Sequence, residues 1–370
     1  MFKAEELFQN VTDKNHPDET VLTIIQGKGT LPREQAGRNI HYDDASLSNY
    51  KKVEQGDFII HLRSFEGGLE MANEAGIVSP AYTILRCKRP HSSLFYDAYF
   101  HTDEFINHNL SKSVEGIRDG RQISYEAFKW LGIPYCEPTE QEKISNLFSV
   151  LNERIAKQRD LVESLKKYKR GVMRAIFRDK SFVFSKATVW KSIRLGDKCV
   201  FFSGGTPKST DSSYYGGSIP FIRSGEIHGE KTELFLTEAG LQNSSAKMVS
   251  KGDLLIALYG ATSGEVDISK IDGAINQAIL CIRPYDMSKQ YLRYLLEDSK
   301  DDIINTYLQG GQGNLSAEII KNLRVDIPDS TAQSSVVEFL STIDKRVEMS
   351  IADHEHIQAM KHGLLQQLFI

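Results

Sequence analysis

The strongest constraint on how this chain can fold is an internal repeat. Residues 123–177 match residues 315–369 without a gap when they are shifted by 192 positions. The identical pairs are Ser124/Ser316, Gln141/Gln333, Arg154/Arg346, Glu163/Glu355, Lys169/Lys361, Gly171/Gly363 and Phe177/Phe369, among others. A weaker match lies upstream, where residues 56–60 correspond to residues 252–256. A period near half the chain length indicates two copies of one globular-plus-helical unit, not a solenoid of short repeats.

The composition is that of a globular protein, and the length suggests two or three domains. The chain has 370 residues, of which 40% are hydrophobic and 25% charged, and its formal net charge is −4. No apolar run approaches the roughly 18 residues needed to cross a bilayer, and the N-terminus does not read as a signal peptide. The four cysteines are widely spaced and form no C-x-x-C pair. We therefore expect reduced thiols and a cytoplasmic location.

Two turn-rich segments alternate with two long helical patterns. Residues 1–138 and 181–328 mix short strand-like apolar runs with Gly, Asn, Asp and Pro, which predicts two globular domains containing helices and strands. Residues 139–180 and 329–370 each read as one helix, preceded by proline and opened by a hydroxyl side chain suited to an N-cap. The predicted fold class is α+β, with each globular domain followed by a long helix.

Both helical patterns carry a coiled-coil seam, in which apolar residues alternate steps of four and three. The predicted seam residues are Ile144, Phe148, Leu151, Ile155, Val162, Leu165, Val172, Ile176, Val336, Leu340, Ile343, Val347, Ile357, Leu364 and Leu368. Polar residues interrupt the two seams at matching layers, Gln158 with Ser350 and Lys169 with Lys361. We predict that the helices, each about 55 Å long, pair as an antiparallel coiled coil with pseudo-two-fold symmetry. The alternative is that each helix folds back on its own domain.

Motifs of known catalytic or metal sites are missing from the sequence. It has no G-x-G-x-x-G after a strand, no H-E-x-x-H and no Asn/Asp-Pro-Pro-Tyr. Residues 204–209 resemble a phosphate-binding loop, but Pro207 stands where that loop requires its second glycine. The ten histidines are dispersed. We therefore expect neither a metal, a cofactor nor intrinsic catalysis.

Two loops carry side chains suited to DNA, each directly before a repeated Ile/Leu-Ser pair. The candidates are Arg118, Arg121 and Gln122 in the first loop, and Gln309, Gln312 and Asn314 in the second. Arginine can bind guanine O6 and N7, and glutamine or asparagine can bind adenine N6 and N7. The compatible alternative is that each loop is a glycine-rich turn into a helix capped by Ser124 or Ser316.

The first long helix is also locally basic. Residues 154–180 hold ten Lys and Arg against three Asp and Glu. Such a run is most often a solvated helix face, but attraction to DNA phosphates and docking of a partner subunit are two further interpretations.

Several segments of the second half together resemble a target-recognition domain of type I restriction–modification specificity (S) subunits. They are Trp-Lys-Ser-Ile-Arg-Leu-Gly-Asp at 190–197, Ser-Gly-Gly-Thr-Pro at 203–207, the stretch 214–222 and Gly-Asp-Leu-Leu at 252–255. Residues 139–144 resemble the segment that opens this family's central helix, and the order domain–helix–domain–helix matches as well. The first copy departs from the family pattern because it lacks the Trp-x-x-x-x-Leu-Gly-Asp opening, and the second copy lacks the Glu before Gln333.

The resemblance implies a non-catalytic subunit that reads double-stranded DNA. Each recognition domain would read one half of a bipartite site, and the helices would hold two methyltransferase (modification) subunits and set the unread spacer. S-adenosylmethionine, ATP and Mg would bind only to those methyltransferases and to restriction subunits. Weaker candidates for DNA contact are Arg63, Thr206, Lys208 and Tyr259. The rival hypotheses are a coiled-coil scaffold or decoy that binds methyltransferase subunits without reading DNA, and a nuclease in its own right.

Overall fold

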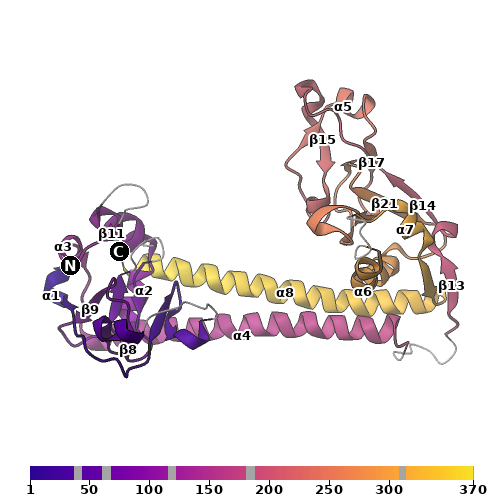
Figure 1. Ribbon diagram of the computed structural model, residues 1–370. Helices are drawn as coiled ribbons and strands as arrows, with labels where there is room; N and C mark the ends of the chain where they lie inside the picture. Colours follow the sequence, from indigo (N-terminus) through magenta and orange to yellow (C-terminus); the bar gives the residue numbers. More distant parts are fainter. Residues whose placement is uncertain (37–43, 61–67, 116–121, 181–187, 308–313, 370) are drawn as a thin grey trace. The chain divides into compact units, whose positions relative to one another are not determined.

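The computed structural model describes residues 1–36, 44–60, 68–115, 122–180, 188–307 and 314–369 (Figure 1). The chain divides into unit 1, residues 1–160 with 351–370, and unit 2, residues 161–350. Helices α4 (Pro138–Phe177) and α8 (Ser330–Leu368) each contribute residues to both units. We call the globular part before α4 domain 1 and the globular part between α4 and α8 domain 2.

Domain 1 is built on an antiparallel sheet of order β2-β9-β6-β7, which packs against helix α2. Its elements are β1 (Phe2–Lys3), α1 (Ala4–Leu7), β2 (Phe8–Val11), β3 (Leu22–Ile25), β4 (Gly29–Pro32), β5 (Lys51–Val53), β6 (Phe58–Ile60), β7 (Glu70–Met71), β8 (Gly76–Val78), β9 (Thr83–Cys87), α2 (Ser93–Phe100), β10 (Val114–Glu115), β11 (Gln122–Ile123), α3 (Tyr125–Phe128) and β12 (Gly132–Ile133). Aromatic rings dominate the core. Edge-to-face pairs join Phe8 to Tyr96 at 5.0 Å and Phe58 to Phe100 at 4.9 Å between ring centroids.

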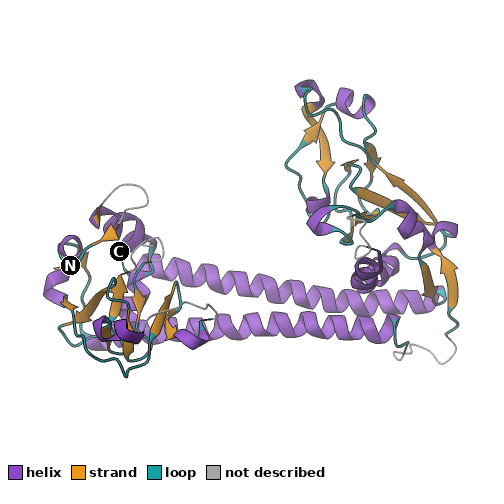
Figure 2. Ribbon diagram, viewed as in Figure 1, coloured by secondary structure: helices purple, strands orange, loops and turns teal. Residues whose placement is uncertain are grey.

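Domain 2 carries its strands in two groups, one beside α6 and one further out along the domain (Figures 1 and 2). The inner sheet has the order β14-β21-β18-β19 and the outer sheet β16-β15-β20-β17. The elements are β13 (Lys191–Arg194), β14 (Cys199–Ser203), β15 (Tyr215–Ile222), β16 (Phe235–Leu236), α5 (Glu238–Gln242), β17 (Lys247–Val249), β18 (Leu254–Ala257), β19 (Val266–Ile268), β20 (Gly273–Ile275), β21 (Ile279–Pro284), α6 (Lys289–Tyr307), α7 (Ala317–Asn322) and β22 (Arg324–Ile327). β13 and β22 pair with each other at the base of the domain.

The main sheets of the two domains have the same strand order, which confirms the internal repeat. The matched segments 56–60 and 252–256 form β6 and β18 with the turn before each. Both turns begin with a glycine at positive φ, +89° at Gly56 and +91° at Gly252, a conformation that favours glycine. The aspartate that follows each glycine then pairs with an arginine on the neighbouring strand, Asp57 with Arg86 at 2.7 Å and Asp253 with Arg283 at 2.6 Å.

The repeated glutamines join each long helix to its domain in the same way. The Gln141 Oε1 atom accepts a hydrogen bond from the Ser92 backbone N–H at 2.9 Å, and Gln333 Oε1 accepts one from Ser288 at 3.0 Å. Both amides also donate to a backbone carbonyl just before the helix, at 2.8 and 3.0 Å. Both glutamines are buried, so each satisfies two backbone groups that would otherwise lack partners.

The divergent N-terminus keeps the position of its counterpart. Strand β1 has two residues against four in β13, but both pair with the strand that precedes a long helix. The Ala4 N–H donates to the Leu131 carbonyl at 2.8 Å, and the Leu195 N–H donates to the Leu323 carbonyl at 3.0 Å. Strand β1 of the first domain therefore occupies the place that β13 has in the second.

The two long helices run antiparallel within each unit, as predicted. In unit 2, Val172 and Ile176 near the end of α4 share a core with Val336 and Leu340 near the start of α8. In unit 1, Phe148 near the start of α4 stacks on Phe369, just past the end of α8, at 6.4 Å. The remaining seam residues are buried or partly buried, with one exception.

The exception is Leu368, which the heptad pattern places in the seam but which is 42% exposed. Leu365 is buried instead. The helix ends at Leu368, and the ring of Phe369 packs against Phe95 and Tyr99 of domain 1 at 5.2 and 5.5 Å. Contacts with these distant residues therefore set the end of the seam.

The two lysines that interrupt the seams, Lys169 and Lys361, lie near carboxylates. The Lys169 ammonium lies 2.7 Å from both Glu297 on α6 and Asp344 on α8. Its repeat partner Lys361 is partly buried, and burial lowers the pKa of Lys361 while the nearby Asp97 carboxylate raises it. Each lysine therefore lies beside carboxylates of its own unit.

Candidate nucleic-acid interface

Four exposed polar side chains come together at one edge of domain 2, and we call them the edge cluster: Thr206, Tyr259, Gln277 and Asn314. They come from four segments, namely the loop after β14, the loop after β18, the turn between β20 and β21, and the residues before α7. The sequence pointed to three of them as candidates for DNA contact. Gln277 was not among them.

Three hydrogen bonds bring the segments of the edge cluster together. The Thr206 hydroxyl donates to Gln277 Oε1 at 2.6 Å. The Leu258 N–H donates to the Ala278 carbonyl at 2.8 Å, which brings the segment of Tyr259 beside the segment of Gln277. The Leu315 N–H then donates to the Leu258 carbonyl at 3.0 Å and brings in the segment of Asn314.

The glycines that precede Thr206 are needed for packing. A Cβ atom on Gly204 would lie 1.7 Å from the carbonyl oxygen of Ile275, and one on Gly205 would lie 2.6 Å from the Ser245 Cβ. Pro207 is buried, and its carbonyl accepts a hydrogen bond from the Tyr215 hydroxyl at 2.8 Å. The loop is thus held close against β20 and the residues before β17.

The turn between β20 and β21 presents Gln277 outward. The Asn276 Oδ1 atom accepts a hydrogen bond from the Ala278 N–H at 3.1 Å, which is the side-chain-to-backbone bond typical of an Asx turn. Ala278 is buried and Gln277 is exposed. A polar pair between two apolar strands was the sequence signal for this turn.

The helix-capping interpretation of the two predicted loops is confirmed. The Ser124 hydroxyl accepts from the Ala127 N–H and the Ser316 hydroxyl from the Ile319 N–H, each at 3.2 Å. Asn314 is exposed beside the second cap. The candidates Arg63, Arg118, Arg121, Gln309 and Gln312 lie outside the described residues. Gln122 belongs to β11, and the structure describes only its backbone.

A lysine occupies the same strand position in both domains. Lys51 on β5 pairs in register with Val78, and Lys247 on β17 pairs with Ile275. The Lys51 ammonium donates to the Tyr82 carbonyl at 2.6 Å, and its burial, together with the charge of Lys14, lowers the pKa of Lys51. Lys247 is exposed with its ammonium 5.8 Å from the centroid of the Phe202 ring, and Lys208 is exposed two residues after Thr206.

Acidic residues neutralise part of the basic run on α4. Arg178 lies 2.9 Å from both Asp298 and Asp302 of α6, and Lys169 is paired as described above. Arg170 and Arg174 are exposed. Within unit 2, some of the basic residues of α4 are therefore paired with α6. Only the exposed basic residues, such as Arg170 and Arg174, are available to phosphates or to a partner.

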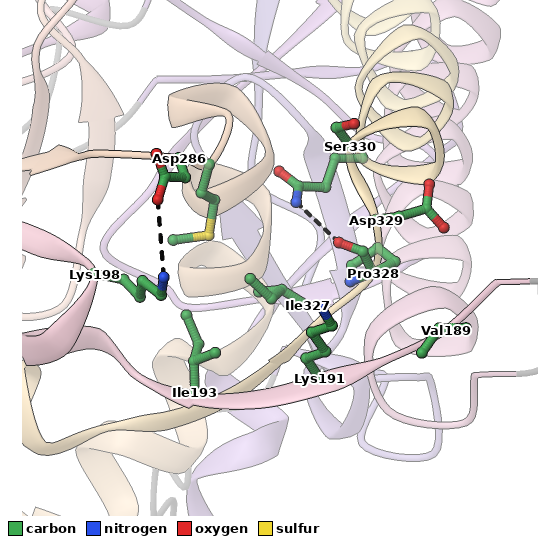
Figure 3. A pocket seen from close by; sticks show the side chains of 11 residues that line it. Val189, Lys191, Ile193, Lys198, Asp286, Ile327, Pro328, Asp329 and Ser330 are labelled. Atoms are coloured by element: carbon green, nitrogen blue, oxygen red, sulfur yellow. Dashed lines mark hydrogen bonds and ion pairs between the residues drawn. The ribbon is translucent and has the colours of Figure 1, made fainter.

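A pocket of about 470 Å³ lies where β13 and β22 meet the start of α8 (Figure 3). Lys198 and Asp286 face each other there at 3.8 Å, and Ile193 and Ile327 add apolar surface. Gln333 also lines it, but its amide is already satisfied by backbone groups. Asp329 and Ser330 line it as well, and the Asp329 carboxylate accepts a hydrogen bond from the Ala332 N–H at 3.0 Å at the start of α8.

Neither a metal nor a membrane site is found in the described parts of the chain. Among residues 1–36, 44–60, 68–115, 122–180, 188–307 and 314–369, no three His, Cys, Asp or Glu side chains are grouped to hold a metal ion. In the same ranges, none of the helices combines the length and the apolar character that a membrane span requires.

Comparison with known proteins points to one family. Residues 188–358 match the family model described as the type I restriction modification DNA specificity domain. The type I restriction enzyme MjaVIII specificity subunit of Methanocaldococcus jannaschii is 22% identical over 338 residues, which are 85% of this chain and 79% of that protein. The MjaIX specificity subunit of the same organism is 25% identical over 49% of this chain and 44% of its own length. The putative type I restriction enzyme MjaX specificity subunit of the same organism is 23% identical over 66% of this chain and 60% of its own length.

Solved structures share the whole fold at low sequence identity. The type I restriction-modification S subunit from M. genitalium superposes with a TM-score of 0.61 and 16% identity, covering 100% of this chain and 95% of that one. A chain from a study of assembly and conformational transition of a type I R-M system gives a TM-score of 0.66 at 16% identity, covering 100% and 96%. The fold of this chain is therefore shared with these two chains.

Proposed function

Because the chain belongs to the family of type I restriction–modification specificity subunits, we propose that it selects the DNA sequence on which a type I complex acts. Each globular domain reads one half of a bipartite site. The two helices hold methyltransferase subunits and fix the unread spacer between the halves. Specificity subunits are non-catalytic, so methylation with S-adenosylmethionine and ATP-driven cleavage are assigned to the partner subunits.

The observation that carries the proposal is a duplicated scaffold with dissimilar edges. The sheets β2-β9-β6-β7 and β14-β21-β18-β19 have the same order, and the paired Asp–Arg and buried Gln contacts recur in both. At the edge, however, the two copies differ, since the residue of domain 1 that corresponds to Gln277 is Pro80. Two similar frames that present different side chains suit two different half-sites.

Exposed apolar side chains on the long helices support the partner assignment. On α4 these are Leu147, Val150, Leu161 and Tyr168, and on α8 they are Met349 and Met360. A Cβ atom added at either of the repeated glycines, Gly171 or Gly363, would meet no neighbouring atom within 4 Å, so both leave open surface. Apolar groups and open glycines on a helix face allow close approach of another helix, which suits docking of a methyltransferase subunit.

Docking can be tested by charge substitution on α4. Tyr168→Glu should abolish co-purification of the chain with the methyltransferase subunit encoded beside it, because the carboxylate would be buried against an apolar partner surface. Lys157→Glu, at another exposed position of the same helix, is the matched control and should leave co-purification intact. Retention of the methyltransferase by Tyr168→Glu would place the docking surface elsewhere.

The recognition function is tested by mapping methylated bases across a genome after co-expression with that methyltransferase. The proposal expects a motif in two parts separated by a fixed spacer. Methylation without a sequence preference, or no methylation at all, would contradict it. The two rival hypotheses predict other results. A scaffold or decoy would bind methyltransferase subunits but would not show the DNA binding, steeply weakened by added salt, that recognition predicts. A nuclease would cut plasmid DNA when only magnesium is added.

A further inference from the structure

We propose that Gln277, held in place by Thr206, is a sequence-independent phosphate contact that positions DNA on domain 2. The inference rests on the proposed function, because it assumes that the edge cluster faces DNA. Thr206 and Gln277 lie 71 positions apart in the chain and are joined by one hydrogen bond.

The hydrogen bond from Thr206 decides which group of the Gln277 amide can bind a ligand. The Thr206 hydroxyl donates to Gln277 Oε1 at 2.6 Å, so the amide oxygen is already bound. Among the described residues, none accepts a hydrogen bond from Gln277 Nε2, and the side chain is exposed. The pair therefore presents two N–H donors to solvent, while one lone pair of the amide oxygen is bound by Thr206.

With its oxygen engaged by Thr206, the Gln277 amide acts mainly as a donor, which fits a phosphate better than a base that needs both kinds of group. Adenine is read by one amide that accepts from N6 and donates to N7. Phosphate oxygens only accept, and glutamine is one of the side chains that commonly bind them. Because Thr206 fixes the amide before DNA arrives, little side-chain entropy is lost on binding.

Two exposed lysines lie on segments adjacent to those of the pair, and the Lys247 ammonium is 5.8 Å from the centroid of the Phe202 ring. Lys247 is exposed on β17, in register with Ile275, which is two residues before Gln277. Lys208 is exposed two residues after Thr206. Cations beside a neutral donor are the usual surroundings of a phosphate site on DNA-binding proteins. In domain 1 the corresponding residue is Pro80, which has no side-chain donor, so the contact belongs to domain 2 alone.

The test is binding of the full chain to a pool of random-sequence duplexes, followed by dissociation constants of the enriched duplex and a scrambled duplex at several salt concentrations. Gln277→Ala should weaken binding to both duplexes by about 10- to 100-fold, because a hydrogen bond to a charged group is lost. The slope of log K against log salt should stay unchanged, since glutamine carries no charge. Gln277→Lys should keep the affinity and steepen that slope by about 0.9.

Two controls separate positioning from folding. Lys247→Ala should make the salt slope shallower by about 0.9, which Gln277→Ala does not. Thr206→Val should weaken both duplexes, whereas Thr206→Ser should bind as the parent chain does, because it keeps the hydroxyl. The melting temperature should be unchanged in Gln277→Ala, since the side chain is exposed.

Several results would overturn the inference. One is a loss in Gln277→Ala that is confined to a single base position, since that would make Gln277 a base reader. Another is unchanged binding of Gln277→Ala to both duplexes. If the parent chain itself enriches no sequence from the pool, the proposed function fails and this inference falls with it.

Discussion

Replacement of Asp253 by asparagine should destabilise unit 2 in a pH-dependent way. The carboxylate is buried and accepts hydrogen bonds from Arg283 at 2.6 Å, from Lys289 at 3.1 Å and from the Ser250 backbone N–H at 3.0 Å. Burial alone would raise the pKa of Asp253, but these three donors lower it from 3.8 to about 2. The aspartate therefore stabilises the folded state only while it is ionised.

The size of the effect follows from the two pKa values. The difference between 3.8 in the unfolded chain and about 2 in the folded chain corresponds to about 2 kcal/mol of stability at neutral pH. Because the folded pKa is the lower one, this stability is fully present above about pH 5 and is lost as the pH falls through 3.8 toward 2. At pH 3 about 1 kcal/mol should remain.

The measurement needs a probe for unit 2 alone, because a chain with two units need not unfold in one step. The chain has two tryptophans, Trp130 in unit 1 and Trp190 in unit 2. In a Trp130→Phe background, urea unfolding followed by Trp190 fluorescence reports on unit 2. Asp253→Asn should lower the free energy of unfolding by about 2 kcal/mol at pH 7 and by about 1 kcal/mol at pH 3.

Asp286→Asn is the matched control in the same unit. Its side chain is 80% exposed and lies 3.8 Å from Lys198, so its loss should change the unfolding free energy by less than about 0.5 kcal/mol. A cost for Asp253→Asn that is as small as that of the control, or that is equal at pH 7 and pH 3, would refute the reasoning.

Three further outcomes are expected. Gln333→Leu leaves two buried backbone groups unpaired and should cost about 2–4 kcal/mol in the Trp190 assay. Gly204→Ala would place a carbon 1.7 Å from a backbone oxygen and should sharply reduce the yield of folded protein, whereas Gly171→Ala, in open helical surface, should raise the unfolding free energy by about 0.5–1 kcal/mol. Lys169→Met removes one of the two cations that lie 2.7 Å from the Asp344 carboxylate, the other being Arg293, and should lower the thermal midpoint more at pH 7 than at pH 3, as followed by circular dichroism.

The fold could largely be predicted from the sequence because its main signals are local or repeated. Heptad spacing depends only on neighbouring residues, and it indicated two long helices with coiled-coil seams. The identity of Gln141 and Gln333 indicated a shared role, which proves to be the same two hydrogen bonds in each unit. The end of the second seam was predicted wrongly at Leu368, because Phe369 packs against domain 1 residues that are distant in sequence.

The candidate interface was less accessible to sequence reasoning. The contact between Thr206 and Gln277 joins two loops far apart in the chain, and neither residue predicts the other. Asn276 and Gln277 appear in the sequence only as a polar pair between apolar strands, which indicates a turn but not which side chain points outward. Base-contact assignments for Arg118, Arg121, Gln309 and Gln312 stay predictions, since these residues lie outside the described ranges.

The central claim is that two dissimilar domains of one chain each read their own half of a DNA site. Its most direct test is to replace residues 191–327 with the corresponding domain of another specificity subunit and to map methylated bases with the same methyltransferase. One half of the motif should change, while the other half and the spacer length stay as they were. A change in both halves, or an unchanged motif, would contradict the account.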